Sequence, residues 1–90
     1  MESLMETKID HLMAHSGVVG VCVADANGLP MSARGTLNGE IAPMAAQLIT
    51  LCSQLEPSNP TPPQVTLMAE HAKVTFSKQD DLILALHQKI

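Results

Sequence analysis

The sequence is almost without aromatic side chains, because Phe76 is the only one among 90 residues and tryptophan and tyrosine are absent. Hydrophobic residues still make up 46% of the chain, so its core must be built mainly from aliphatic side chains, methionine and alanine. A chain of this length buries only about two-thirds of its unfolded surface, which leaves a small stability margin. We therefore expect one domain, residues 1–90, that gains stability from a partner.

Positive charge is also scarce. The formal net charge is −4, and the five Lys and Arg residues form no cluster. Because clustered Lys and Arg supply most nucleic-acid affinity, we expect no nucleic-acid partner. The first ten residues, MESLMETKID, have neither the basic start nor the apolar core of a signal peptide, and no apolar run is long enough to span a bilayer. These absences predict a cytoplasmic protein that does not insert directly into a membrane.

Motifs of catalysis and metal binding are missing as well. The chain has no P-loop, dinucleotide fingerprint or nucleophile elbow. No metal-ligand spacing joins its histidines and cysteines, which are His11, His15, His71, His87, Cys22 and Cys52. Both cysteines are expected to be buried, inert thiols, and Arg34 an ordinary exposed charge. We therefore predict no catalytic residue, no cofactor, no metal and no enzymatic activity.

Two strands joined by a tight turn give the strongest positive signal. The first strand, Val18 to Ala24, is apolar on both faces, which is typical of a strand buried in the centre of a sheet. The sequence DANG follows at residues 25–28, with a side-chain acceptor at the first turn position and a glycine at the last. Pro30 lies in the second strand, Leu29 to Arg34, and places it at a sheet edge because proline cannot donate a ladder hydrogen bond.

A first helix is predicted before this hairpin, ending ahead of Gly17. Ser3 and Glu6 have the spacing of a capping box. Apolar residues then recur at helical intervals at Met5, Ile9, Leu12 and Met13.

A second, longer helix is predicted after the hairpin, with Pro43 in its first turn. The sequence leaves open which residue between Asn38 and Glu40 is its N-cap. One regular apolar stripe contains Ile41, Met44, Ala45, Leu48, Leu51, Cys52 and Leu55. A second row of mostly small residues lies beside it, at Ala42, Ala46, Ile49 and Ser53. Together they cover more of the helix than one sheet requires, so the second row is either a contact for a partner helix or a sparsely exposed surface.

Three strand patterns follow a proline-rich connector, residues 56–63. They are Val65 to Glu70, a segment around Val74 and Phe76, and Leu82 to His87, which is again apolar on both faces. Placing both two-faced strands centrally predicts an α+β fold with a five-stranded antiparallel sheet of order 2-1-5-4-3 and two helices. The element order is α-β-β-α-β-β-β.

The third strand then forms the far edge of the sheet. Its residues Val65, Thr66, Leu67, Met68 and Ala69 include no proline and no lysine that would discourage pairing with another chain. We expect this edge and the second row of the neighbouring helix to act together in one two-fold-like partner interface.

The whole chain resembles the roadblock family. The resemblance is most specific in VVGVCVADANGLPMSARGTL at residues 18–37, with its Val-Gly-Val, Asp-x-x-Gly-Leu and Arg-Gly-Thr elements, and in VTFSKQDDLILALHQ at residues 74–88. It implies a roadblock-like fold whose subunits pair through the third strand and the second helix.

The resemblance also implies a function. It points to a non-catalytic scaffold subunit of a Ragulator-like complex, paired with a second roadblock-fold subunit. Such a complex holds Rag GTPases at the late endosome and lysosome for amino-acid signalling to the target-of-rapamycin kinase complex. The chain would then be cytoplasmic and peripheral to that membrane through its partners. The alternative is a dynein-type roadblock light chain or a homodimeric regulator of a small GTPase. A small-ligand sensor is disfavoured because few polar groups converge and almost no aromatic residue can line a pocket.

Overall fold

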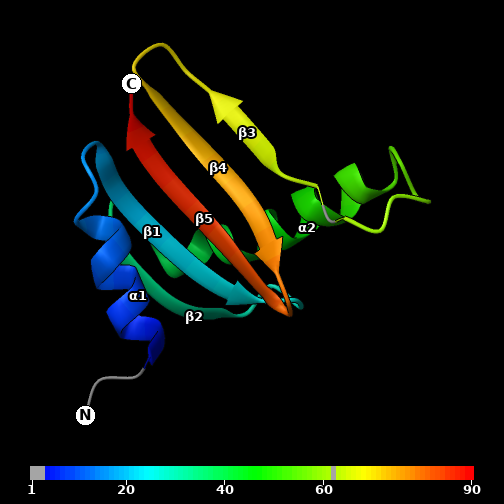
Figure 1. Cartoon of the computed structure of the whole chain (residues 1–90), viewed down its shortest axis with the longest axis horizontal. Coiled ribbons are helices and arrows are strands. Elements are labelled where there is room, and N and C mark those ends of the chain that lie inside the picture. Colours follow the sequence, from blue (N-terminus) through cyan, green and yellow to red (C-terminus); the bar gives the residue numbers. More distant parts are fainter. Residues whose placement is uncertain (1–3, 62) are drawn as a thin grey trace.

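The computed structural model describes residues 4–61 and 63–90. Its elements follow the predicted order (Figure 1): α1 Leu4–Met13, β1 Val18–Asp25, β2 Pro30–Gly35, the short 3₁₀ helix η1 Gly39–Ile41, α2 Ala42–Ser53, β3 Val65–Met68, β4 Ala72–Gln79 and β5 Leu82–Lys89. All strands pair antiparallel in the order β2-β1-β5-β4-β3, which confirms the predicted sheet. The predicted cap residue Ser3 lies outside the described residues.

The sheet lies between the two helices, with α1 on one face and α2 on the other (Figure 1). On the α1 side, Ile9 packs with Val18, Val21 and Val23. On the α2 side, Phe76 is completely buried in a cluster with Cys22, Ala24, Ala42, Ala45, Ile49, Ile83 and Ala85. Strands β1 and β5 contribute to both clusters, so their two apolar faces are explained by their central position.

The hairpin turn between β1 and β2 forms as the sequence predicts. Asp25 Oδ1 accepts hydrogen bonds from the backbone N–H groups of Asn27 and Leu29, both at 2.9 Å. Gly28 has φ +85°, and a Cβ atom there would lie 3.1 Å from Pro43 Cα. Glycine is therefore required both by the turn and by the close approach of α2.

The predicted cap window, Asn38 to Glu40, lies too early for α2, whose N-cap is Ile41 and makes no side-chain cap hydrogen bond. Asn38 lies before η1 instead. Its side-chain oxygen accepts a hydrogen bond from the Glu40 backbone N–H at 2.9 Å and caps η1. The chain passes from η1 directly into α2, and Pro43 lies in the first turn of α2, where no intrahelical N–H bond is lost.

The two cysteines differ in burial. Cys22 is 2% exposed, and burial raises the pKa of its thiol. Cys52 is only half-buried, so the expectation of two buried thiols is wrong for this residue, which sits near the C-terminal end of α2 and not in the sheet. Within residues 4–61 and 63–90, no group of three His, Cys, Asp or Glu side chains is arranged to hold a metal ion. None of the helices formed by these residues is long and apolar enough to cross a membrane.

Candidate partner interface

Strand β3 is an edge of the sheet, and among the described residues it pairs only with β4. It is shorter than the predicted Val65 to Glu70, because the chain turns after Met68 and the Ala69 N–H donates to the Ala72 carbonyl at 2.8 Å. Leu67 is 48% exposed and Met68 is 68% exposed. Large apolar side chains thus lie on a strand that has one unpaired side.

The backbone of β3 has donors that point away from the sheet. Because the Ala69 N–H points toward β4 and donors alternate along an antiparallel strand, the N–H groups of Val65 and Leu67 also point toward β4. Those of Thr66 and Met68 therefore point to the open edge. This edge can accept a further antiparallel strand from another chain.

The outer face of α2 carries a row of exposed apolar side chains. Met44 is 44% exposed, Leu51 is 53% exposed and Leu55, just beyond the helix, is 80% exposed. Leu48 lies between them at helical spacing and is half-buried. From Ala42 to Leu55 the sequence contains no charged residue. We call this row, Met44, Leu48, Leu51 and Leu55, the outer stripe.

The rotation of α2 differs from the prediction. Ala42 is completely buried and Ile49 is 4% exposed, and both pack in the α2-side cluster with Ala45. The expectation that Ala42 and Ile49 lie on an outer row is therefore wrong. Small alanines face the sheet because they let the helix backbone approach Phe76 closely, and this turns Met44 and Leu51 outward.

The other two residues of the predicted row remain at the surface. Ala46 is half-buried, and Ser53 is exposed, with its hydroxyl donating to the Ile49 carbonyl at 2.8 Å. Sequence reasoning missed the outward position of the outer stripe, because α2 is apolar around most of its circumference and periodicity alone does not show which of two apolar rows is buried. The absence of charge from the helix is the signal that marks its outer face as unusual.

The C-terminal end of α2 adjoins the open edge of β3. An open hollow of about 790 Å³ lies between them, lined by Ser53 and Leu55 on one side and by Val65 and Thr66 on the other. The connector after α2 also lines it, and Figure 1 shows this connector projecting past β3. The structure thus brings Leu55, the C-terminal residue of the outer stripe, next to the β3 strand.

Charged groups lie at the border of this surface. The nearest ion pair along the chain joins His71 Nε2 and Glu70 Oε1 at 3.6 Å in the exposed turn after β3. Glu56 and Lys78 also line the hollow between α2 and β3. Along α2 itself the exposed side chains are apolar or uncharged polar ones, such as Gln47 and Thr50. Such a surface can bury apolar area and extend a sheet.

The sequence matches the family model described as "Ragulator complex protein LAMTOR5" over residues 1–89. A "Ragulator complex protein LAMTOR5 homolog" of Nematostella vectensis is 30% identical over 88 residues, which cover 98% of this chain and 97% of the relative. The Xenopus laevis "Ragulator complex protein LAMTOR5" is 27% identical, also over 88 residues, with the same coverage of both chains.

Solved structures show the same fold. The "Roadblock/LC7 Domain from Streptomyces avermitilis" superposes with a TM-score of 0.74 at 17% identity and covers 89% of this chain and 73% of that one. The "Gliding protein-mglB" of Thermus thermophilus gives 0.81 at 10% identity, with 99% and 76% covered. Likeness at these identities establishes the roadblock fold, and the match over nearly the full length shows that this chain belongs to the Ragulator complex protein LAMTOR5 family.

Proposed function

We propose that this protein is a non-catalytic scaffold subunit that pairs with a second roadblock-fold subunit through the β3 edge and the outer face of α2. The observation that carries the proposal is the outer stripe, an exposed apolar row on a charge-free helix that adjoins an unpaired strand. The surface consists of Val65, Thr66, Leu67, Met68, Ala69, Ala46 and Ser53 from the sequence prediction, together with the outer stripe.

The two parts of this surface have different roles in pairing. The N–H groups of Thr66 and Met68 donate to an antiparallel strand of the partner and set the register of the joined sheet. The outer stripe packs against a partner helix and supplies apolar burial, at roughly 25 cal/mol for each Å² removed from water. Because a helix without charges makes no ion pairs, the partner helix is expected to be apolar or uncharged at this contact.

In the cell, we propose that the pair belongs to a Ragulator-like complex that holds Rag GTPases at the late endosome and lysosome for amino-acid signalling to the target-of-rapamycin kinase complex. Membership of the Ragulator complex protein LAMTOR5 family supports this assignment. The protein would be cytoplasmic and reach the membrane surface through its partners.

Affinity purification from the native cell, followed by identification of stoichiometric partners, tests the proposal. A second roadblock-fold protein recovered together with Rag GTPases supports it. Recovery of dynein intermediate chain points to a light-chain role, and recovery of a homodimer with another small GTPase points to a homodimeric regulator. A bare monomer would contradict all three functions.

A further inference from the structure

Helix α1 is a short cover over one apolar face of the sheet. Ile9 is its only fully buried residue, at 1% exposure, while Met5, Leu12 and Met13 are partly buried and Leu4 is 74% exposed. Helices shorter than about 12 residues are marginal in water on their own, and α1 has ten. The helix is therefore expected to persist only while it is docked.

Among residues 4–61 and 63–90, this cover is incomplete along one side. A groove of about 520 Å³ runs between α1 and the sheet, with Leu4 and Leu12 on the helix side and Val23, Leu82 and Leu84 on the sheet side. Apolar atoms thus line an open groove beside the docked helix, and the hydrophobic contact that holds α1 is correspondingly limited.

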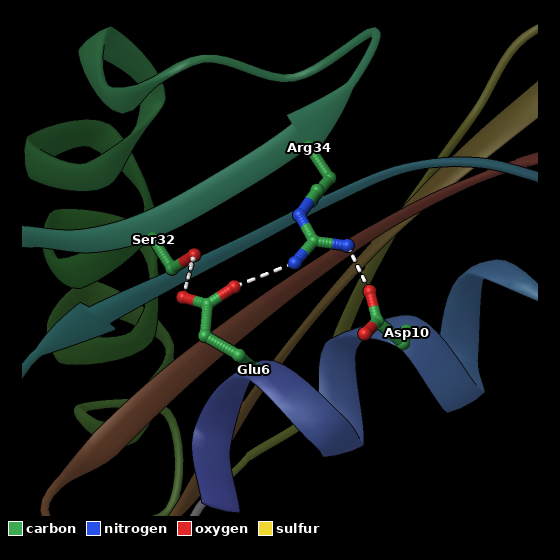
Figure 2. A network of polar contacts seen from close by, with 4 residues as sticks. All are labelled: Glu6, Asp10, Ser32 and Arg34. Atoms are coloured by element: carbon green, nitrogen blue, oxygen red, sulfur yellow. Dashed lines mark hydrogen bonds and ion pairs between the residues drawn. The ribbon is translucent and has the colours of Figure 1, made fainter. Parts of the chain in front are cut away.

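A polar cluster ties α1 to the edge strand β2 (Figure 2). Arg34 Nη2 donates to Glu6 Oε2 at 2.6 Å, and Arg34 Nη1 donates to Asp10. Ser32 Oγ donates to the second carboxylate oxygen of Glu6 at 2.9 Å. We call these four residues the α1 latch; in it Arg34, expected from the sequence to be an ordinary exposed charge, spans two carboxylates one helical turn apart.

The geometry of the latch is matched on both elements. Glu6 and Asp10 are four residues apart and lie on one face of α1, while Ser32 and Arg34 are two apart and lie on one face of β2 (Figure 2). The hydrogen bond to Asp10, and to a smaller extent the one to Glu6, raises the pKa of Arg34, which stays protonated at any physiological pH. The ion-pairing side chains are between 33% and 46% exposed, so dissolved salt can weaken their attraction.

We propose that α1 opens from the sheet as a separate unit and that the α1 latch controls how often it does so. When the latch is broken, the short helix loses its ion pairs with β2 and opens more often. Opening uncovers Val21, Val23, Leu84 and Leu86, while the sheet and the α2-side cluster remain folded. The opening exposes this apolar face and does not involve the β3 edge, whose residues lie outside the α1-side cluster.

Amide hydrogen exchange of the full-length protein tests the proposal. The first four N–H groups of a helix lack intrahelical partners, so the amides of residues 8–13 are followed, with β1 and β5 as internal references. In Arg34→Gln we expect the α1 amides to exchange about three- to fivefold faster, with β1 and β5 unchanged. Lys73→Gln on β4 removes the same charge elsewhere and should leave α1 exchange as it is in the wild type.

A salt titration separates the latch from general destabilisation. At about 1 M salt the Debye length falls to about 3 Å, so α1 exchange should rise in the wild type and stay constant in Arg34→Gln. Asp10→Asn, which removes the negative charge from one arm only, should give about a twofold increase, and it provides the test if Arg34→Gln does not fold. Equal acceleration of α1 and β1, or α1 exchange that these substitutions leave unchanged, would overturn the proposal.

Discussion

The two edges of the sheet are treated differently by the chain. At the β2 edge, η1 runs against the strand closely enough that a Cβ atom on Gly39 would lie 3.0 Å from the Pro30 ring, and the α1 latch holds Ser32 and Arg34. At the β3 edge, the described residues offer four residues of strand with exposed Leu67 and Met68. The protein thus covers one edge with its own backbone and charges, while among the described residues the other edge pairs with no further strand.

This difference limits the kind of assembly that forms. Two open edges on opposite sides of a sheet would allow subunits to add without end, whereas one open edge allows a closed pair. Pro30 and the adjacent η1 are therefore expected to discourage pairing at the β2 edge. The comparison predicts that equivalent substitutions at the two edges have unequal effects on pairing.

The largest expected effect comes from a charge in the outer stripe. Leu51→Glu places a carboxylate where the partner helix packs, and a buried unpaired charge costs about 3 kcal/mol, or about 100-fold in affinity. Leu29→Glu at the β2 end is the matched control, because Leu29 is 62% exposed and Leu51 is 53% exposed. Calorimetric titration with the partner subunit measures both; equal losses of affinity would show that the outer stripe is not the contact.

A charge on the β3 strand itself should have a smaller but clear effect. Met68→Glu is expected to weaken pairing about tenfold, and Met31→Glu on β2 should leave it unchanged, since both methionines are exposed in the isolated subunit. The free energy of unfolding of each isolated variant should stay within about 0.5 kcal/mol of the wild type. Size-exclusion chromatography at limiting concentration measures dissociation of the pair. An unchanged elution volume for Met68→Glu would contradict pairing through the β3 edge.

The smallest expected effect concerns Cys22 in the α2-side cluster. Burial raises the pKa of this thiol, so the unfolded chain loses the proton first as the pH rises. The raised pKa of Cys22 stabilises the folded state fully below the ordinary thiol pKa of about 8.5. As the pH climbs from there through the raised value, the free energy of unfolding falls by at most about 1.4 kcal/mol per pH unit.

Urea unfolding from pH 7 to pH 10 measures this fall. Cys22→Ala should flatten the alkaline decline, whereas Cys52→Ala should keep it because Cys22 is still present. A thiol reagent at pH 7 should also modify the half-buried Cys52 faster than the buried Cys22. Equal rates at the two thiols would mean that the cluster around Cys22 is not closed to the reagent.

Local signals in the sequence were sufficient for the elements and the sheet order. The DANG turn at residues 25–28 and Pro30 act within a few residues, and the two-faced apolar patterns of β1 and β5 require central positions whatever surrounds them. The rotation of α2 could not be predicted in this way. It depends on Gly28 meeting Pro43 and on alanines meeting Phe76, contacts between distant segments of the chain.

The α1 latch could not be predicted from the sequence either, because Arg34 lies 24 residues from Asp10 and 28 residues from Glu6. Within the candidate interface, the β3 edge followed from its alternation and lack of protective residues, although the strand proved shorter at Met68. The outer stripe became visible only once the buried side of α2 was known.

The pairing of the β3 edge is tested most directly by amide exchange of this subunit with and without its roadblock-fold partner. We predict that the Thr66 and Met68 amides, which point to the open edge, become protected in the complex, while the amides of β2 keep the exchange rates of the free protein. Protection of β2 with no change at Thr66 and Met68 would contradict the account.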